Sequence, residues 1–314
     1  MKKIIFTLLA SMTFMLTMAQ SEEIVFTPQW TAQAQFAGYY VAQAKGFYRE
    51  AGLNVRIKHP SASNPCVNLL KEGKSQLITL HLISAMKNIN AGTPLINVLQ
   101  TSQANSQMII SHKPLKSVED LRGKRMGRWK AGFFELGHLI NNQYNLNIEW
   151  VPFVQNVNLY ITGAIDATMA MTYNEYYQLL MAGQHIEKNQ TLYFRDLGCN
   201  VPEDGLYVLA DYYRRHQQEV KKFAEASRRG WEWVAKHPEE ALDIVMEFAK
   251  ANHIKTNRAA QRWMLNEILK AMKDEKSGQR TYHLKESALQ HANNILLKNT
   301  TIKKPITYKQ ITQP

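Results

Sequence analysis

Residues 30–53, WTAQAQFAGYYVAQAKGFYREAGL, decide the fold of this chain. Apolar side chains recur within this stretch at spacings of three or four residues: Phe36, Tyr40, Ala44, Phe47 and Ala51. That spacing predicts a helix with one apolar face. Gly52 follows where a left-handed glycine commonly ends a helix, and Leu53 comes next to cover it. The stretch therefore predicts a helix that packs its apolar face on a sheet.

Two β-like runs flank the predicted helix. Residues 24–27, IVFT, precede it, and residues 53–58, LNVRIK, follow it with alternating apolar and polar side chains. In a strand–helix–strand unit, ligands bind where the carboxyl end of the strand meets the start of the helix. Trp30 lies at that junction and is therefore the first candidate binding residue.

The same stretch carries a family resemblance. Trp30, Gly38-Tyr39-Tyr40 and the pattern AxxKGFYxxxGLxV, which starts at Ala42, resemble the family of periplasmic binding proteins for thiamine pyrimidine precursors and of eukaryotic pyrimidine-precursor synthases. More loosely, they are similar to binding proteins for alkanesulfonates, taurine and nitrate. The long pattern indicates the fold of that superfamily, whereas Trp30 and Tyr39 favour the pyrimidine branch. Tyr39 is thus a second candidate, although its helical position also suits a core residue.

Residues 1–19 have the features of a secretory signal. Lys2 and Lys3 precede an apolar run, and small residues precede Gln20. The run is shorter than the roughly 20 residues of a bilayer span, and no cysteine precedes Cys66, so a lipobox is absent. We expect export to the periplasm with cleavage near Ala19, and an uncleaved signal that serves as an anchor is the alternative.

Composition fits a globular protein without nucleic-acid binding. The chain has 314 residues, 45% of them hydrophobic, and a net charge of +12, which falls to +10 without Lys2 and Lys3. Basic residues are scattered singly and are expected on solvated faces. Cys66 and Cys199 fall in different predicted lobes, so we expect two separate thiols. Since no metal-ligand spacing occurs, we expect neither a metal nor a cofactor.

The chain after residue 53 alternates between predicted helices and strands. The expected strands are 76–80, 95–99, 124–129, 148–154, 165–171, 192–197 and 205–210, and the expected helices include 67–73, 132–140, 173–181, 258–273 and 285–298. We place lobe 1 at residues 20–110 and lobe 2 at residues 111–204, while residues 205–314 return to lobe 1 and add C-terminal helices. This order predicts an α/β, type II periplasmic binding protein, whose two lobes are joined by two hinge crossovers.

Further candidate residues follow the predicted strands. His81 follows the third strand, where it is either a ligand contact or an ordinary loop histidine. Gly132 and Phe133 lie at a strand-to-helix junction, whose free N–H groups could hold an anion or a ring heteroatom. Tyr173 and Asn174 begin a helix after another strand. We expect these groups to line one ligand cleft.

Glu175 is the candidate that distinguishes between ligand classes. A carboxylate can accept a hydrogen bond from the exocyclic amine of a 4-aminopyrimidine and can pair with a protonated ring nitrogen. In the resembling family a glutamate follows this strand in a similar place, and here the match is limited to Asn174-Glu175. A solvated glutamate on a helix face is the alternative.

An enzyme is the alternative from a different functional class. The resembling synthases consume a histidine and a bound pyridoxal phosphate, and they carry a cysteine-rich run that corresponds to residues 197–202 here. Only Cys199 remains of that run. Their lysine and histidine would fall on His81 and Ala85, so neither is kept. We therefore expect a protein that is not an enzyme.

The resemblance and the residues together predict a monomeric, exported binding protein that delivers its ligand to the permease of an ABC transporter. The expected ligand is a thiamine-related aminopyrimidine. Trp30 and one of Tyr39, Phe133 or Tyr173 would enclose its ring, while Glu175 would bind its amine. An alkanesulfonate, taurine or nitrate binder is the alternative within binding proteins.

Overall fold

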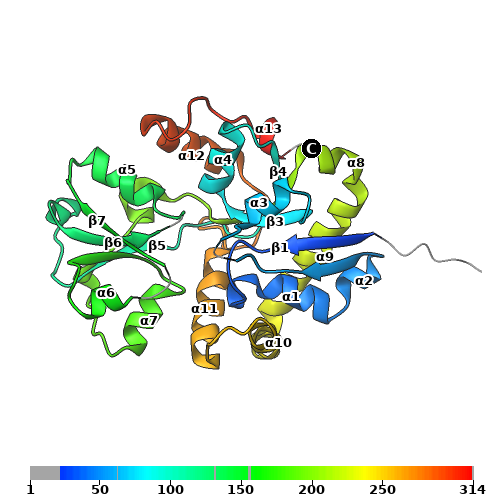
Figure 1. Ribbon diagram of the computed structural model, residues 1–314, viewed down its shortest axis with the longest axis horizontal. Coiled ribbons are helices and arrows are strands. Elements are labelled where there is room, and N and C mark those ends of the chain that lie inside the picture. The colour runs from blue at the N-terminus through cyan, green and yellow to red at the C-terminus, as the bar shows by residue number, and fades with distance from the viewer. Residues whose placement is uncertain (1–21, 62, 131, 155–156, 313–314) are drawn as a thin grey trace, which may run out of the picture.

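The computed structural model describes residues 22–61, 63–130, 132–154 and 157–312. They form two lobes, each built on a five-stranded sheet (Figure 1). The strand order is β2-β1-β3-β10-β4 in lobe 1 and β7-β6-β8-β5-β9 in lobe 2. The predicted architecture, two α/β lobes joined by two crossovers, is confirmed. The expected signal at residues 1–19 lies outside the described residues.

Lobe 1 contains the first four strands and one strand that returns late in the chain. Its strands are β1 (Glu23–Thr27), β2 (Asn54–Ile57), β3 (Leu77–His81), β4 (Leu95–Gln100) and β10 (Asp204–Leu209). Its early helices are η1 (Ala34–Phe36), α1 (Ala37–Ala44), α2 (Phe47–Glu50), α3 (Cys66–Lys71) and α4 (Leu82–Asn90). Because β1 pairs in parallel with both β2 and β3, their carboxyl ends meet at one edge of the sheet.

The stretch that decides the fold forms two helices instead of the single predicted one. Gly46 has a left-handed backbone (φ 79°) and separates α1 from α2. Gly52 also adopts a left-handed φ of 77°, as the sequence predicts. Phe36 and Tyr40 are fully buried, as the predicted apolar face requires, whereas Phe47 and Ala51 are partly buried and Ala44 is exposed. The predicted packing face is therefore wrong at Ala44.

Lobe 2 is formed by the middle of the chain. Its strands are β5 (Gln107–Ser111), β6 (Arg125–Trp129), β7 (Glu149–Phe153), β8 (Ala167–Met171) and β9 (Thr191–Tyr193). Its helices are η2 (Val118–Leu121), α5 (Glu135–Gln143), α6 (Asn158–Ile161), α7 (Glu175–Met181), η3 (Lys188–Gln190) and η4 (Arg195–Cys199). The strand expected at 192–197 therefore ends early, and a helical turn replaces its second half.

The two crossovers lie side by side and are hydrogen-bonded to each other. The Ser106 N–H donates to Oε1 of Glu203 (2.9 Å), and the Asn105 N–H donates to Oδ1 of Asn200 (2.9 Å). Residues 101–106 already lead into β5, so the chain enters the second sheet a few residues before the boundary expected at residue 111. The reason is that β5 pairs with β8 along its whole length.

The C-terminal part of the chain is helical. It forms α8 (Ala210–Arg215), α9 (Gln217–Lys236), α10 (Pro238–Ala251), α11 (Arg258–Ala271), α12 (Glu286–Lys298) and α13 (Tyr308–Thr312). Helix α9 packs closely on α1, where a Cβ atom on Gly230 would lie 2.0 Å from the carbonyl oxygen of Gly38. Helix α11 stands between the two sheets (Figure 1) and contacts both η1 and α7.

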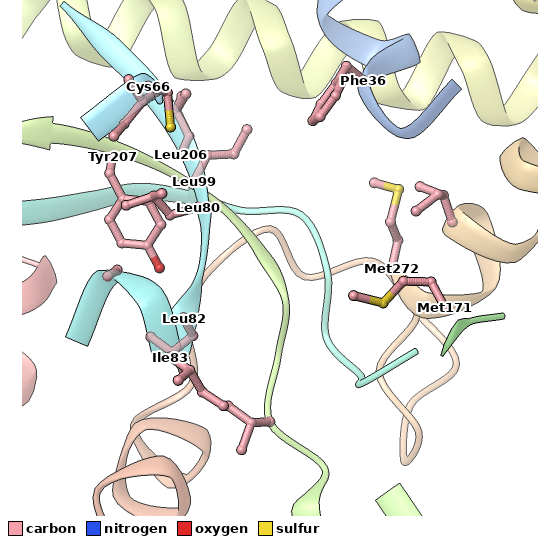
Figure 2. Packing of buried hydrophobic residues seen from close by; sticks show 14 of the residues in the cluster. Phe36, Cys66, Leu80, Leu82, Ile83, Leu99, Met171, Leu206, Tyr207 and Met272 are labelled. Atoms are coloured by element: carbon pink, nitrogen blue, oxygen red, sulfur yellow. The ribbon is translucent and has the colours of Figure 1, made fainter. Parts of the chain in front are cut away.

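The apolar core continues through both lobes. Figure 2 shows Leu80, Leu99 and Leu206, from three neighbouring strands of lobe 1, gathered beside Cys66 and Tyr207. Burial of apolar side chains of this kind contributes about 25 cal/mol per Å² to folding. Among the described residues, no helix is long and apolar enough to cross a membrane.

Both cysteines are buried and free, as the sequence predicts. Burial raises the pKa of the Cys66 thiol to about 12 and the pKa of the Cys199 thiol to about 11. Because the thiolate is the nucleophilic form of cysteine, both side chains are weak nucleophiles at neutral pH.

Candidate ligand-binding site between the lobes

A small cavity lies where the two lobes meet. Its lining comes from both lobes: Gln29, Trp30, Gln33, Gln35, His81, Trp129, Phe133, Met171, Tyr173, Asn174 and Glu175. Its free volume of about 20 Å³ holds one or two water molecules. A wider cavity of about 620 Å³ adjoins it on the side of α7 and α11. We call these the inner and the outer cavity.

Most of the predicted site residues meet at the inner cavity. Those that line it are Trp30, His81, Phe133, Tyr173, Asn174 and Glu175. They come from the ends of β1, β3, β6 and β8 and from the start of α7. They converge because these are the strand ends that face the space between the lobes. Tyr39 and Gly132 do not line either cavity.

Tyr39 belongs to the core of lobe 1. Its ring centroid lies 4.5 Å from that of Phe26 and 6.0 Å from that of Trp231. Helix α1 turns this side chain toward β1 and α9 and therefore away from the ligand side of the sheet. The prediction that Tyr39 binds the ring is wrong, and the alternative of a core residue holds.

Gly132 does not start a helix. It has a left-handed φ of 74°, and Phe133 after it has a φ of 60°. Helix α5 begins at Glu135, so the expected helix at 132–140 starts later. The prediction that Gly132 offers a helix N-terminus to a ligand is therefore wrong. The two left-handed residues instead turn the Phe133 side chain into the inner cavity.

Phe133 fills much of the space between the lobes. Its ring centroid lies 4.6 Å from that of His81, 5.8 Å from that of Trp30 and 6.2 Å from that of Trp129. The contact with Trp30 is edge-on, so these two rings are not parallel faces around a slot. In this closed arrangement, space for a ligand ring is found at the junction with the outer cavity.

Glu175 is the polar centre of the lobe 2 wall. Its buried carboxylate accepts hydrogen bonds from Trp129 Nε1 (3.2 Å), Asn174 Nδ2 (3.0 Å) and the Met171 N–H (3.0 Å). Burial raises the pKa of this carboxyl, while the hydrogen bonds oppose that shift. A carboxylate has about four acceptor positions, and the backbone N–H of Glu175 is a further group that lowers the pKa of this carboxyl. Its place in the first turn of α7 also favours negative charge.

Asp204 is the polar centre of the lobe 1 wall. It accepts from Gln29 Nε2 (2.5 Å) and from Gln35 Nε2 (2.9 Å), and its Oδ1 lies 3.4 Å from His81 Nε2. The Gln29 side chain also accepts from the His81 N–H (3.0 Å), and Gln33 Nε2 donates to Gln35 Oε1 (2.6 Å). These groups form one network, in which His81 Nε2 makes the longest contact.

The charges in this wall are coupled. Burial alone lowers the pKa of His81, but the hydrogen bond to Asp204 and the nearby charge of Glu203 outweigh it, so the pKa of His81 is raised. Burial raises the pKa of Glu203 to about 7. Sequence reasoning missed Asp204 and the three glutamines. A detectable signal was the run Gln29, Gln33 and Gln35 around Trp30.

A second hydrogen-bonded chain holds Trp30 in place. His59 Nδ1 donates to the Trp30 carbonyl oxygen (2.6 Å), and the Tyr40 hydroxyl donates to His59 Nε2 (2.9 Å). This arrangement requires neutral His59, and burial lowers its pKa to about 4. The chain therefore connects helix α1 to the loop that carries the first predicted site residue.

The lobes are also joined outside the cavities. Lys87 Nζ of α4 lies 2.6 Å from Glu135 Oε1 of α5, and the Glu135 side chain is only 9% exposed. On another side, Trp263 Nε1 of α11 donates to the Thr172 carbonyl oxygen (2.8 Å). These contacts bridge the two lobes, so the structure represents a closed arrangement.

Comparisons with known proteins agree with this architecture. A model of the family described as NMT1/THI5 like matches residues 33–241, more than half of the chain. The matched region covers the break at Gly46 and both crossovers. It also covers the cavity-lining residues between Phe133 and Glu175. It therefore includes parts of both walls of the candidate site, while Gln29 and Trp30 precede it.

Named relatives align over most of the chain. The riboflavin-binding protein RibY of Chloroflexus aurantiacus is 25% identical over 270 residues, covering 82% of this chain and 75% of that protein. A formylaminopyrimidine-binding protein of Halalkalibacterium halodurans is 24% identical over 237 residues, covering 69% and 68%. A 4-amino-5-hydroxymethyl-2-methylpyrimidine phosphate synthase of Aspergillus parasiticus is 22% identical over 254 residues, covering 76% and 74%.

A solved structure shows the same fold. The periplasmic aliphatic sulphonate binding protein SsuA from Escherichia coli superposes with a TM-score of 0.64 at 16% identity, covering 93% of this chain and 92% of that one. At this identity the likeness concerns the fold alone. Together with the family match, it leads to one conclusion: the chain belongs to the NMT1/THI5-like family and has the fold of periplasmic binding proteins.

Proposed function

We propose that this protein captures a thiamine-related aminopyrimidine in the periplasm and delivers it to the permease of an ABC transporter. The observation that carries this proposal is the buried Glu175 carboxylate, which lines both cavities together with the aromatic residues Trp30 and Tyr173. The name of the formylaminopyrimidine-binding relative supports the same ligand class.

The ligand ring would lie at the junction of the two cavities. The side chains that line both are Trp30, Gln33, Tyr173, Asn174 and Glu175. Trp30 belongs to lobe 1 and Tyr173 to lobe 2, so each face of the ring would contact a different lobe. The exocyclic amine would donate to Glu175. Because these contacts coexist only when the lobes are closed, the ligand would shift the population toward the closed state.

The charges around the inner cavity favour this ligand over an anion. Among the described residues, no lysine or arginine lines the inner cavity, whereas Glu175 contributes a carboxylate to its lining. A sulfonate or nitrate at this place would be repelled by Glu175, and the repulsion is strengthened by the low local dielectric constant. The sulfonate, taurine and nitrate alternatives are therefore less favoured.

We propose binding rather than catalysis. The family includes proteins named as synthases, so an enzyme is the alternative. However, Cys199 is buried, its raised pKa disfavours the thiolate, and it lines neither cavity. His81 does line the inner cavity, where its Nε2 lies 3.4 Å from Oδ1 of Asp204. We further propose that residues 1–19 direct export and that the mature protein is a monomer.

Thermal unfolding with a ligand series tests the proposal. The series contains 4-amino-5-hydroxymethyl-2-methylpyrimidine, its formylaminomethyl analogue, thiamine, taurine, an alkanesulfonate and nitrate. A ligand at 100 times its dissociation constant stabilises the folded state by about 2.7 kcal/mol. We expect a clear rise in Tm with the pyrimidines and none with the anions. A rise with the anions alone would overturn the proposed ligand class.

A further inference from the structure

We propose that the outer cavity is a second subsite, which binds a neutral hydroxylated chain attached to the ligand ring. This inference rests on the proposed function, because the ring must first occupy the junction of the two cavities. The outer cavity of about 620 Å³ is far larger than the inner one of about 20 Å³. A ligand that consisted of the ring alone would leave most of this space to water.

The outer cavity has a wall that sequence reasoning did not assign to the site. Besides α7 and the Trp30 loop, it is lined by residues 254–257 and by the first turns of α11. This wall is fixed to lobe 1, because Gln261 Oε1 accepts from the Ala34 N–H (2.7 Å) and Gln261 Nε2 donates to Thr256 Oγ1 (2.9 Å). Gln261 thus joins residues 254–257 and α11 to lobe 1.

The same wall is also fixed to lobe 2. The Trp263 ring is stacked on the Tyr177 ring with centroids 4.8 Å apart, and Trp263 Nε1 donates to the Thr172 carbonyl oxygen. Helix α11 therefore contacts both lobes, through η1 and α7, and stands between the two sheets (Figure 1). A chain that leaves the ring toward the solvent would pass along this helix.

The lining chemistry indicates the class of chain. Hydroxyl and amide side chains come from all three sides of the cavity: Thr31, Gln33, Asn174, Gln178, Thr256 and Asn257. Such groups both donate and accept hydrogen bonds, as the hydroxyls of a polyol do. Apolar side chains lie between these polar groups, among them Met181 of α7 and Met264 of α11.

A phosphate fits the same wall less well. Phosphate recognition favours the planar fork of arginine, which can form two parallel hydrogen bonds. Among the described residues, Lys255 is the only lysine or arginine in the lining, and its side chain is exposed. A neutral chain needs no second cation in the wall, and the carboxylate of Glu175 does not repel it.

The test uses probes that share one ring and differ only in the chain. They are 4-amino-5-hydroxymethyl-2-methylpyrimidine, the 5-aminomethyl pyrimidine acylated with glyceric acid, and the same amine acylated with butanoic acid. Isothermal titration gives the dissociation constant of each probe. We expect the glyceric amide to bind at least ten times more tightly than the hydroxymethyl compound, and the butanoic amide, of similar length, to gain less than threefold.

Two variants on opposite walls, Thr256→Val and Gln178→Leu, test whether the outer cavity causes the gain in affinity. Each should bring the affinity ratio of the glyceric amide to the hydroxymethyl compound down severalfold, whereas Thr162→Val, on an exposed turn outside both cavities, should leave the ratio unchanged. A ratio near one in the wild-type protein, an equal gain with the butanoic amide, or an unchanged ratio in both variants would overturn the subsite. If no probe binds, the proposed function fails and the subsite falls with it.

Discussion

The two walls of the cleft each contain a buried carboxylate, but only one of the two lines the cavities. In lobe 1, Asp204 accepts from Gln29 and Gln35, lies beside His81 and lines neither cavity. In lobe 2, Glu175 accepts three hydrogen bonds and lines both cavities. The comparison shows that a buried carboxylate near the cleft is not by itself a candidate ligand contact.

The largest expected effect comes from opening the lobe 1 network. Asp204→Asn replaces one acceptor oxygen with an NH₂ group that would face the donors of Gln29 and Gln35. Removing one partner from a buried charged network costs about 3–5 kcal/mol, and we expect a loss of about 3 kcal/mol in the free energy of unfolding. Urea unfolding measures it, with the exposed Asp211→Asn as control. A loss below about 1 kcal/mol would contradict the structural role of Asp204.

Glu203, at the crossover between the walls, should make stability depend on pH. Its pKa is about 7 in the folded protein and near the ordinary 4.5 when unfolded. The folded state therefore binds more protons between these values, so the free energy of unfolding falls as the pH rises from 4.5 to 7. The shift corresponds to a fall of up to about 3 kcal/mol.

Glu203→Gln removes this titration while it keeps an oxygen for the Ser106 N–H. Urea unfolding at pH 5, 6, 7 and 8 should show a flatter profile for this variant than for the wild type. The exposed Glu247→Gln serves as control and should retain the wild-type slope. If Glu203→Gln also retains that slope, the titrating group lies elsewhere.

The next effect concerns ligand affinity and the lobe 2 wall. Glu175→Gln removes the charge and places an NH₂ group against the donors of Trp129, Asn174 or Met171. A hydrogen bond to a charged group contributes about 1.5–3 kcal/mol, so we expect pyrimidine affinity to fall about 10–100-fold. Isothermal titration checks this, with the exposed Glu149→Gln as control. Unchanged affinity would show that Glu175 does not contact the ligand.

The smallest expected effect comes from the support of Trp30. His59→Phe removes the donor to the Trp30 carbonyl oxygen and the acceptor for Tyr40. The loss of such a neutral hydrogen bond costs about 1 kcal/mol, which corresponds to an affinity reduced about fivefold. Titration with the pyrimidine measures it, and the exposed His185→Phe is the matched control. If the two variants bind alike, Trp30 needs no such support.

Much of the fold could be predicted from the sequence, because periodicity and turn residues are local signals. The two strands predicted on either side of residues 30–53 are examples, and both are present. The single helix was wrong because Gly46 adopts a left-handed backbone, which a regular apolar spacing does not reveal. The exact point of entry into lobe 2 depends on the pairing of β5 with β8, a long-range contact.

The candidate site was predictable where it depends on strand ends. Trp30, His81, Tyr173 and Glu175 meet because parallel strands of each sheet end at one edge. Asp204 was missed because β10 enters lobe 1 antiparallel and places its first residue opposite His81. The prediction that Tyr39 binds the ligand was wrong, because the side of α1 that faces the core depends on where α9 packs.

The free volume of the inner cavity was also beyond sequence reasoning. It is set by the Phe133 ring, which enters the cavity from a left-handed turn. The size of the outer cavity depends likewise on α11, a helix distant in sequence from the other walls.

The central claim is that Glu175 binds the exocyclic amine of an aminopyrimidine. The most direct measurement is a cycle of dissociation constants for wild type and Glu175→Gln with 4-amino-5-hydroxymethyl-2-methylpyrimidine and with the same ring lacking the 4-amino group. The account predicts that loss of the amine weakens binding to the wild type about 10–100-fold and weakens binding to the variant little. An equal loss in both proteins would contradict it, because the amine would then be bound by another group.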